Sequence, residues 1–275
     1  MGRRFVFILI ALCGLALAAA PLRLATTTSV NDSGLLEAIL PDFTRQTGIE
    51  VQVIAVGTGQ ALAIAGRGDA DAVLVHAPDL EARFLREGLG VAHACVAYNN
   101  FVIAGPASDP ARVDGAASAL DAMQRIYAAG APFISRGDNS GTYHRERALW
   151  KAAGLEPDGQ PWYLESGSGM GATLSLAAEK RAYTLTDLGT YLFMKDKVEL
   201  AGLYDRPDPL MLNQYGYMVV SPGRFARVNA EAAYRLRAYL LRPDVQRRIG
   251  AYLKDRFARS LFNPLYGQCK VEVKP

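Results

Sequence analysis

Three turns rich in hydroxyl and glycine residues carry the side chains that could do chemistry in this sequence. The turns lie at residues 26–29, 57–59 and 135–142, and the last of them also contains Arg136. Each turn precedes a stretch with the apolar spacing of a helix, so its backbone amides and hydroxyls gather at a helix N-terminus. Amides, hydroxyls and one guanidinium in that position are the groups that hold an oxyanion.

The elements that must position these turns alternate between strand and helix. In the first half of the chain, we predict strands at 22–25, 51–56 and 72–75, and helices at 34–47, 60–65 and 80–87. This alternation favours a parallel sheet with helices on both faces. Ligands bind such sheets at the carboxyl ends of the strands. We therefore expect the three turns to line one pocket.

A second alternation follows the first and predicts a second lobe. It comprises helices at 116–128, 143–153, 170–180 and 187–194, and strands at 132–134, 162–164 and 182–185. Extended crossings near Ala104 and Gly216 return the last helices, predicted at 228–241 and 245–254, to the first lobe. The fold class is α/β, with a mainly parallel sheet flanked by helices in each lobe and a two-strand hinge. We expect lobe 1 at 21–105 and 216–275, and lobe 2 at 106–215.

Residues 1–20 have the three parts of a cleavable signal peptide. Arg3 and Arg4 precede an apolar run at 5–17, and small alanines follow it. We predict cleavage after Ala18 and a soluble, periplasmic mature protein, because no later stretch reaches the roughly 20 apolar residues of a membrane span. A lipid anchor at Cys13 is the alternative, which the bulky Leu12 before it disfavours.

The net charge of the mature chain bears on its possible partners. The 30 basic residues include two in the signal peptide, so 28 face 27 acidic residues and leave a mature net charge near +1. This balance gives no case for nucleic acid or a membrane surface as partner.

Removal of Cys13 leaves Cys95 and Cys269, which we predict to form a disulfide in an oxidising compartment. The alternative is a buried Cys95 with Cys269 free.

A tetrahedral dianion offers only hydrogen-bond acceptors, so its site must offer donors. We expect Arg136 to supply the charged donor, and neighbouring amides, including those of Gly59 and Gly141, to contribute. The expected hydroxyl donors are Thr28, Ser29, Thr58, Ser140 and Thr142. Several neutral donors with a single arginine hold an anion tightly yet allow its release when two lobes open.

The order of the motifs resembles that of the tungstate-binding proteins of bacterial ABC uptake systems. The matching motifs lie at 26–29, 32–36, 56–62, 68–71, 75–78, 135–138, 140–142, 169–171 and 183–187. The resemblance implies a type II periplasmic-binding-protein fold, capture of tungstate between the lobes, and delivery to a membrane permease with its ATPase. It also implies a fourth anion-facing loop at Ser168 and Gly169. Ser168 departs from the longer polar residue expected there.

Phosphate and molybdate are alternative ligands. Phosphate-binding proteins resemble this chain at 136–142, and their aspartate accepts the proton of hydrogen phosphate. Tungstate carries no proton at neutral pH, so a tungstate site requires Asp138 to point at Arg136 or to cap backbone amides. The remaining motifs favour tungstate. Molybdate stays open because the two anions have almost the same size and charge.

An enzyme is the alternative from a different class. It would need a base beside Ser29 or Ser140, yet the histidines show no triad or metal-ligand spacing. These are His76, His93 and His144. Asp69 and Asp71, which flank an alanine, are typical of a solvated turn. We expect a monomer that is not an enzyme, with no catalytic residue, metal or cofactor; a sensory or adaptor protein of the same fold is a third hypothesis.

Overall fold

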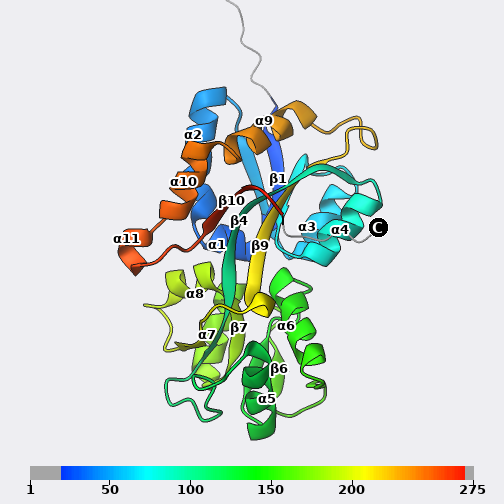
Figure 1. Ribbon diagram of the computed structural model, residues 1–275. Coiled ribbons are helices and arrows are strands. Elements are labelled where there is room, and N and C mark those ends of the chain that lie inside the picture. Colours follow the sequence, from blue (N-terminus) through cyan, green and yellow to red (C-terminus); the bar gives the residue numbers. More distant parts are fainter. Residues whose placement is uncertain (1–19, 270–275) are drawn as a thin grey trace, which may run out of the picture.

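The computed structural model describes residues 20–269 and arranges them in an upper and a lower lobe that two long strands connect (Figure 1). Among these residues, no helix is long and apolar enough to cross a membrane. The predicted signal peptide and Cys13 lie outside the described residues, apart from Ala20.

A six-stranded path of sheet forms the centre of the upper lobe. In spatial order its strands are β10 (Asn263–Gly267), β4 (Gly90–Gly105), β9 (Leu212–Val220), β3 (Ala72–Val75), β1 (Leu22–Thr27) and β2 (Val51–Val56). β1 pairs in parallel with β2 and β3, whereas β9 and β10 run antiparallel to their neighbours. Leu22, Leu24 and Ala25 are fully buried, so β1 has its side chains covered on both faces.

Helices cover both faces of this sheet. They are α1 (Thr28–Asp32), α2 (Leu35–Thr47), α3 (Thr58–Ala65), α4 (Pro78–Arg86), α9 (Ala230–Leu240), α10 (Pro243–Ala251) and α11 (Lys254–Phe257). Asp32 and Ser33 do not cap α2; its N-cap is Gly34, whose backbone is in the left-handed region with φ of 72°. The extra helix α1 takes up that part of the chain, and Thr27 caps it by accepting a hydrogen bond from the Val30 amide.

The lower lobe contains the second alternation. Its strands are β5 (Phe133–Ser135), β6 (Tyr163–Glu165), β7 (Thr184–Asp187) and β8 (Ala201–Tyr204); its helices are α5 (Ala119–Ala129), α6 (Gly141–Ala152), α7 (Met170–Lys180), α8 (Leu188–Met194) and the short 3-10 helix η1 (Pro209–Met211). β5 and β6 pair in parallel, while β7 and β8 pair antiparallel with β4. The core of this lobe packs Phe133, Trp150 and Tyr183.

The sixteen-residue strand β4 belongs to both lobes. It pairs with β9 from Gly90 to Asn100 and with β7 from Phe101 to Ala104. Gly216 pairs inside the upper sheet. The change of partner thus lies between Asn100 and Phe101, a few residues before the expected crossing at Ala104, and the lobe boundaries at 105 and 216 stay a prediction.

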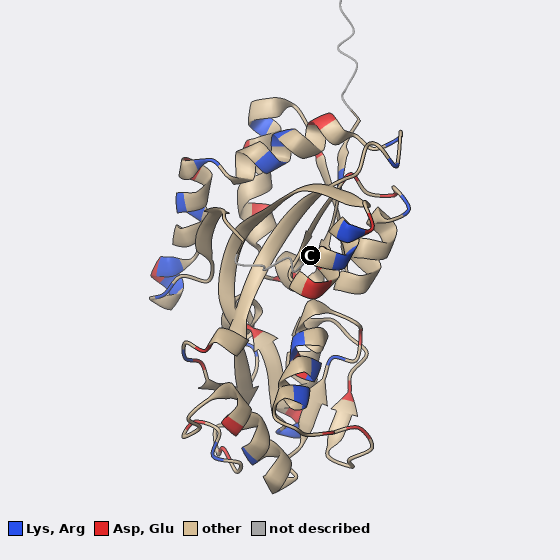
Figure 2. Ribbon diagram, turned by 45° about the vertical axis from the view of Figure 1, so that its right-hand side comes forward, with Lys and Arg blue, Asp and Glu red and all other residues tan. Residues whose placement is uncertain are grey.

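The C-terminal end of the described chain returns to the upper sheet. β10 pairs with β4, and Cys269 just beyond it forms a disulfide with Cys95 of β4, with a Cα–Cα distance of 5.0 Å. Charged residues of both signs are interspersed over the two lobes (Figure 2). This distribution agrees with the near-neutral balance of the sequence.

Candidate oxyanion-binding site

Loops from the two lobes meet at the carboxyl ends of their strands. The loops after β1, β2 and β3 come from the upper lobe, and those after β5 and β6 come from the lower lobe. Across the contact, the Gly141 amide donates to Thr58 Oγ1 at 2.9 Å, and the Gly59 amide donates to the Asn139 carbonyl at 3.3 Å. The structure therefore brings the three turns together, as the sequence predicts.

Arg136 follows β5 and lies at the centre of this contact. Its side chain is 1% exposed, pairs with Asp138, and donates through Nη2 to Thr28 Oγ1 at 3.2 Å. Its Nε donates to the Ser168 carbonyl at 3.3 Å. Nη1 is buried and has no hydrogen-bond partner among residues 20–269. An unpaired buried donor of this kind costs several kcal/mol, so the geometry suits a ligand that brings an acceptor.

Both carboxylate oxygens of Asp138 are engaged within the loop. Oδ2 faces Arg136, and Oδ1 accepts a hydrogen bond from the Ser140 amide at 3.2 Å. This is the arrangement that the sequence requires of an aspartate beside an unprotonated dianion.

Two hydroxyls of the same loop lie at the N-terminus of α6. Ser140 caps the helix by accepting from the Tyr143 amide at 3.2 Å, which leaves its own proton to donate. Thr142 is 1% exposed, and its Oγ1 has no partner among the described residues. The helix N-terminus adds partial positive charge of about half a unit on the same side.

Thr28 and Ser29 begin α1 and complete the upper wall of the contact. Ser29 Oγ lies 2.9 Å from His76 Nε2 and 3.1 Å from Thr27 Oγ1. The sequence suggests only a satisfied polar residue for His76. The structure instead buries it against a predicted site residue and leaves its Nδ1 without a partner in the described chain. Its position directly after β3 is the signal that could have indicated it.

The imidazole of His76 is held neutral. Burial, followed by the nearby positive charge of Arg136, lowers the pKa of His76 to about 3. A neutral imidazole can either accept the Ser29 proton or donate its own to Ser29 Oγ. In the second arrangement Ser29 keeps its proton for a bound anion.

The fourth loop contributes through its backbone. The Ser168 carbonyl accepts from Arg136, whereas the Ser168 hydroxyl donates to the Ser166 carbonyl at 3.1 Å. Gly169 begins α7, and a Cβ placed there would lie 3.5 Å from Thr28 Oγ1. The side chain of Ser168, which departs from the residue type expected at this position, therefore bonds within its own loop.

Glycines allow the lobes to approach this closely. A Cβ at Gly141 would lie 2.8 Å from the His76 carbonyl oxygen and 2.9 Å from its Nδ1. A Cβ at Gly57 would lie 3.1 Å from the Asp138 carbonyl oxygen, and one at Gly59 would overlap the Asn139 side chain. The motif glycines thus serve the contact between lobes as well as the local turns.

Comparison with known proteins agrees with this geometry. The family model described as a PBP superfamily domain matches residues 17–242. The tungstate-binding protein TupA of Peptoclostridium acidaminophilum is 43% identical over 243 residues, which cover 88% of this chain and 84% of that relative. The chain belongs to this family of tungstate-binding proteins.

Two solved structures extend the family comparison. The tungstate ABC transporter structure from Geobacter sulfurreducens has 46% identity and a TM-score of 0.79, and the match covers 86% of this chain and all of that one. The tungstate-binding protein TupA from Desulfovibrio alaskensis G20 has 40% identity and a TM-score of 0.74, and the match covers 90% of this chain and 99% of that one. The type II periplasmic-binding fold expected from the sequence is confirmed.

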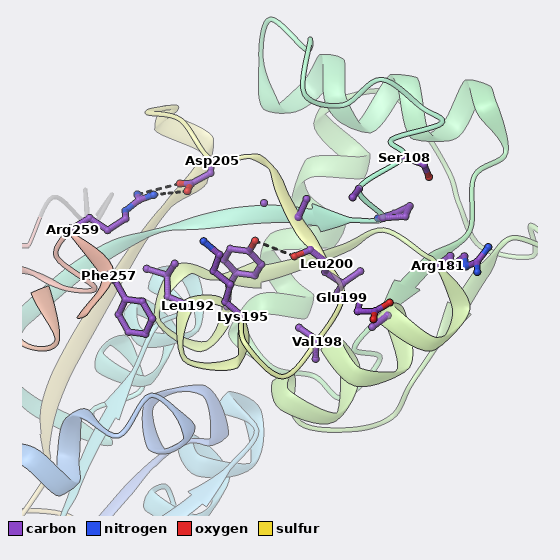
Figure 3. Close-up of a pocket in the computed structure, with 16 residues that line it drawn as sticks. Ser108, Arg181, Leu192, Lys195, Val198, Glu199, Leu200, Asp205, Phe257 and Arg259 are labelled. Atoms are coloured by element: carbon purple, nitrogen blue, oxygen red, sulfur yellow. Dashed lines mark hydrogen bonds and ion pairs between the residues drawn. The ribbon is translucent and has the colours of Figure 1, made fainter. Parts of the chain in front are cut away.

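Other hollows of the molecule have a different character. A cavity of about 300 Å³ lies beside the oxyanion loops, lined in part by His76, Gly141 and Arg145. A larger groove of about 850 Å³ lies between the lobes elsewhere, where Arg259 pairs with Asp205 (Figure 3). None of the predicted site residues lines that groove.

Proposed function

We propose that this protein captures tungstate between its two lobes and delivers it to an ABC permease with its ATPase. The observation that carries the proposal is Arg136, a buried guanidinium whose Nη1 has no partner among the described residues. Among the described residues, the carboxylate that contacts this guanidinium is that of Asp138, with which it forms an ion pair, and the loops that carry the other predicted donors meet beside it. The proposed ligand groups are Thr28, Ser29, Thr58, Gly59, Arg136, Ser140, Gly141, Thr142, Ser168 and Gly169. Of these, the amides of Gly59 and Gly141 and the hydroxyl of Ser168 donate to protein acceptors in this structure and must exchange those bonds to bind the anion.

Asp138 supports tungstate over phosphate. A phosphate site of this pattern needs a carboxylate oxygen that accepts a proton from the ligand. Here one oxygen faces Arg136 and the other accepts from the Ser140 amide. An unprotonated dianion fits this arrangement without rebuilding the loop.

The arrangement of strands supports a hinged capture. We propose lobe 1 at 21–105 and 216–275, and lobe 2 at 106–215, with β4 and β9 as the connection between them. Opening at this connection breaks the bond from the Gly141 amide to Thr58 and separates Thr28 from Arg136. The bound anion then loses donors from one lobe at once, which allows its release to a permease.

The proposal places the mature protein in the periplasm as a monomer, after removal of residues 1–20. It assigns no catalysis and no cofactor to the chain. The family relationship supports this role, since the relatives include a tungstate-binding protein and a tungstate ABC transporter.

Calorimetric titration of the mature protein, stripped of bound anion, tests the proposal. Tungstate, molybdate, phosphate and sulfate are titrated in turn. We expect tight one-to-one binding of tungstate and weak or absent binding of phosphate and sulfate; the molybdate titration sets the selectivity between the two metal oxyanions. Phosphate binding without a tungstate preference would transfer the assignment to phosphate, and no binding of any anion would favour a sensory role.

A further inference from the structure

A second cluster of polar side chains lies in the upper lobe, outside the oxyanion loops. It consists of Glu81 from α4, His93 and Cys95 from β4, and Cys269 after β10. Ligand atoms of His93, Cys95 and Cys269 all lie within 4.8 Å of one another. Cys269 Sγ is 3.9 Å from His93 Nδ1 and 3.8 Å from Nε2. The function proposed above uses none of these residues.

The imidazole in this cluster is held in place by a buried carboxylate. Glu81 is 1% exposed; its Oε2 lies 3.0 Å from His93 Nε2, and its Oε1 accepts from the Ala77 amide at 2.9 Å. Gly216 on β9 faces the pair, and a Cβ there would lie 2.8 Å from His93 Nε2. With Nε2–H donating to Glu81, the lone pair of His93 is on Nδ1. Carboxylates orient metal-binding histidines in this way.

We propose that reduction of the Cys95–Cys269 disulfide converts this cluster into a zinc site. Its ligands are the two thiolates and His93 Nδ1, with water in the fourth position and Glu81 as the positioning residue. A dithiol reductant donates two electrons and two protons to the disulfide and is itself oxidised to a disulfide. Zinc then displaces the two thiol protons as two Zn–S bonds and one Zn–N bond form.

The ligand set and its spacing suit zinc. Two thiolates with one imidazole form a known zinc ligand set, and Zn–S bonds of about 2.3 Å in a tetrahedron place neighbouring ligand atoms roughly 3.5 to 3.8 Å apart. The observed separations between Cys269 Sγ and the His93 nitrogens are close to this value. The two sulfur atoms must also move apart once their bond is reduced.

The site has a consequence for the C-terminal end of the chain. In the oxidised protein the disulfide ties the residues after β10 to β4. In the reduced protein zinc bridges the same two cysteines. The segment is thus held on the sheet in both redox states, by a covalent bond in one and by a metal in the other.

Zinc titration of the mature chain in its two redox states tests the inference without any substitution. Metal-free protein is reduced with a phosphine without oxygen and titrated by calorimetry, and the oxidised protein is titrated in parallel. We expect one zinc per reduced chain and none per oxidised chain. Absence of one-to-one binding by the reduced protein, or equal binding by the oxidised protein, would overturn the proposal.

Variants and cobalt identify the ligands. Cobalt in the reduced protein should give a near-ultraviolet sulfur-to-cobalt band, which the double variant Cys95→Ala, Cys269→Ala should lack. Glu81→Gln should keep the band but bind zinc about 10- to 100-fold more weakly, since it removes the carboxylate behind His93. Unchanged tungstate binding in each variant shows that it is folded. Full zinc affinity in a folded Cys269→Ala variant would refute the assignment.

Discussion

Two of the contacts between the lobes differ in their exposure to water. At the oxyanion loops, the Arg136 side chain is 1% exposed and has one unpaired nitrogen among the described residues. Beside the groove of Figure 3, Arg259 pairs with Asp205 and Arg256 pairs with Asp196, and these arginine side chains are 42% and 49% exposed. Arginine side chains join the lobes in both contacts. We call the contact at Arg136 the dry contact, because this arginine is buried, and the contact at Arg256 and Arg259 the wet contact, because these arginines are exposed.

This difference in exposure separates the contact that can recognise an anion from the contact that can affect lobe closure. Water screens the exposed pairs, so each is worth about 0 to 1 kcal/mol and can break without a large cost. The Arg136 guanidinium is almost fully buried, so a bond between it and an anion would be strong and directional. We infer that anion specificity lies in the dry contact, while the wet contact adjusts the balance between open and closed lobes.

Removal of the Arg136 guanidinium should have the largest effect on tungstate binding. Arg136→Ala removes a charged donor from a buried site, and a bond to a charged group contributes about 1.5 to 3 kcal/mol. We expect an affinity loss of roughly 10- to 100-fold by calorimetry. Arg136→Lys keeps the charge but not the planar guanidinium. Its tungstate affinity should lie between those of Arg136→Ala and the natural protein. Unchanged affinity in Arg136→Ala would remove this residue from the site.

Closure of the dry contact should be blocked by one methyl group. In Gly141→Ala, the new Cβ would lie 2.8 Å from the His76 carbonyl oxygen, and overpacking of this kind costs about 1 to 3 kcal/mol. We expect weaker tungstate binding with little change in the melting temperature of the anion-free protein. Gly171→Ala is the matched control, because its Cβ meets no atom nearer than 4.0 Å. Equal affinities in the two variants would contradict the observed closure.

A single neutral hydrogen bond should matter less than the arginine. Thr58→Val removes the acceptor of the Gly141 amide, and Ser29→Ala removes a hydroxyl while the neighbouring amides remain. Each should weaken tungstate binding by about 1 kcal/mol, or roughly fivefold. A loss as large as that of Arg136→Ala would mean that the neutral donors, and not the guanidinium, dominate.

The wet contact should give a smaller effect that depends on salt. Arg259→Ala breaks the exposed pair with Asp205, so affinity should fall by less than about fivefold and the difference should shrink as salt rises. Asp205→Ala removes the other partner of the pair, so its loss of tungstate affinity should equal that of Arg259→Ala. A salt-independent loss in either variant would show that this contact is drier than its exposure indicates.

The smallest expected effect is that of pH. Because burial and Arg136 lower the pKa of His76 to about 3, the imidazole stays neutral from pH 6 to pH 8. Tungstate affinity should therefore be the same at both values by calorimetry. The depressed pKa has a cost for folding only in acid, since below about pH 6.5 the unfolded chain takes up a proton that folded His76 refuses. A clear gain in affinity from pH 8 to pH 6 would indicate an imidazolium in the site.

Much of the fold could be predicted because its longer helices have a clear apolar period. The helix at 170–180 is correct to the residue, and Asp187, where the next helix is predicted to begin, is the N-cap of α8. The strands β8 and β10 were missed because each has only four or five residues and lies in a stretch without alternation. Helix α1 was missed for the same reason, since five residues show no helical period.

The candidate site was predictable in its chemistry but not in all its contacts. The hydroxyls, glycines and Arg136 can be recognised from their positions after strands. The involvement of His76 could not, because its contact with Ser29 joins residues 47 apart. The backbone role of Ser168 was equally hidden, because a carbonyl oxygen has no signature in the sequence.

The sequence by itself determined the kind of ligand and the lobes that hold it, because donor side chains and the periods of helix and strand are local properties. Only the tertiary structure decided which donors are dry. Burial of Arg136 to 1% exposure, the approach of Gly141 to His76, and the cluster of Glu81, His93 and the two cysteines all depend on segments that are far apart in the sequence. The strength of a charge or hydrogen bond depends on its exclusion from water, and that exclusion exists only once the lobes have packed.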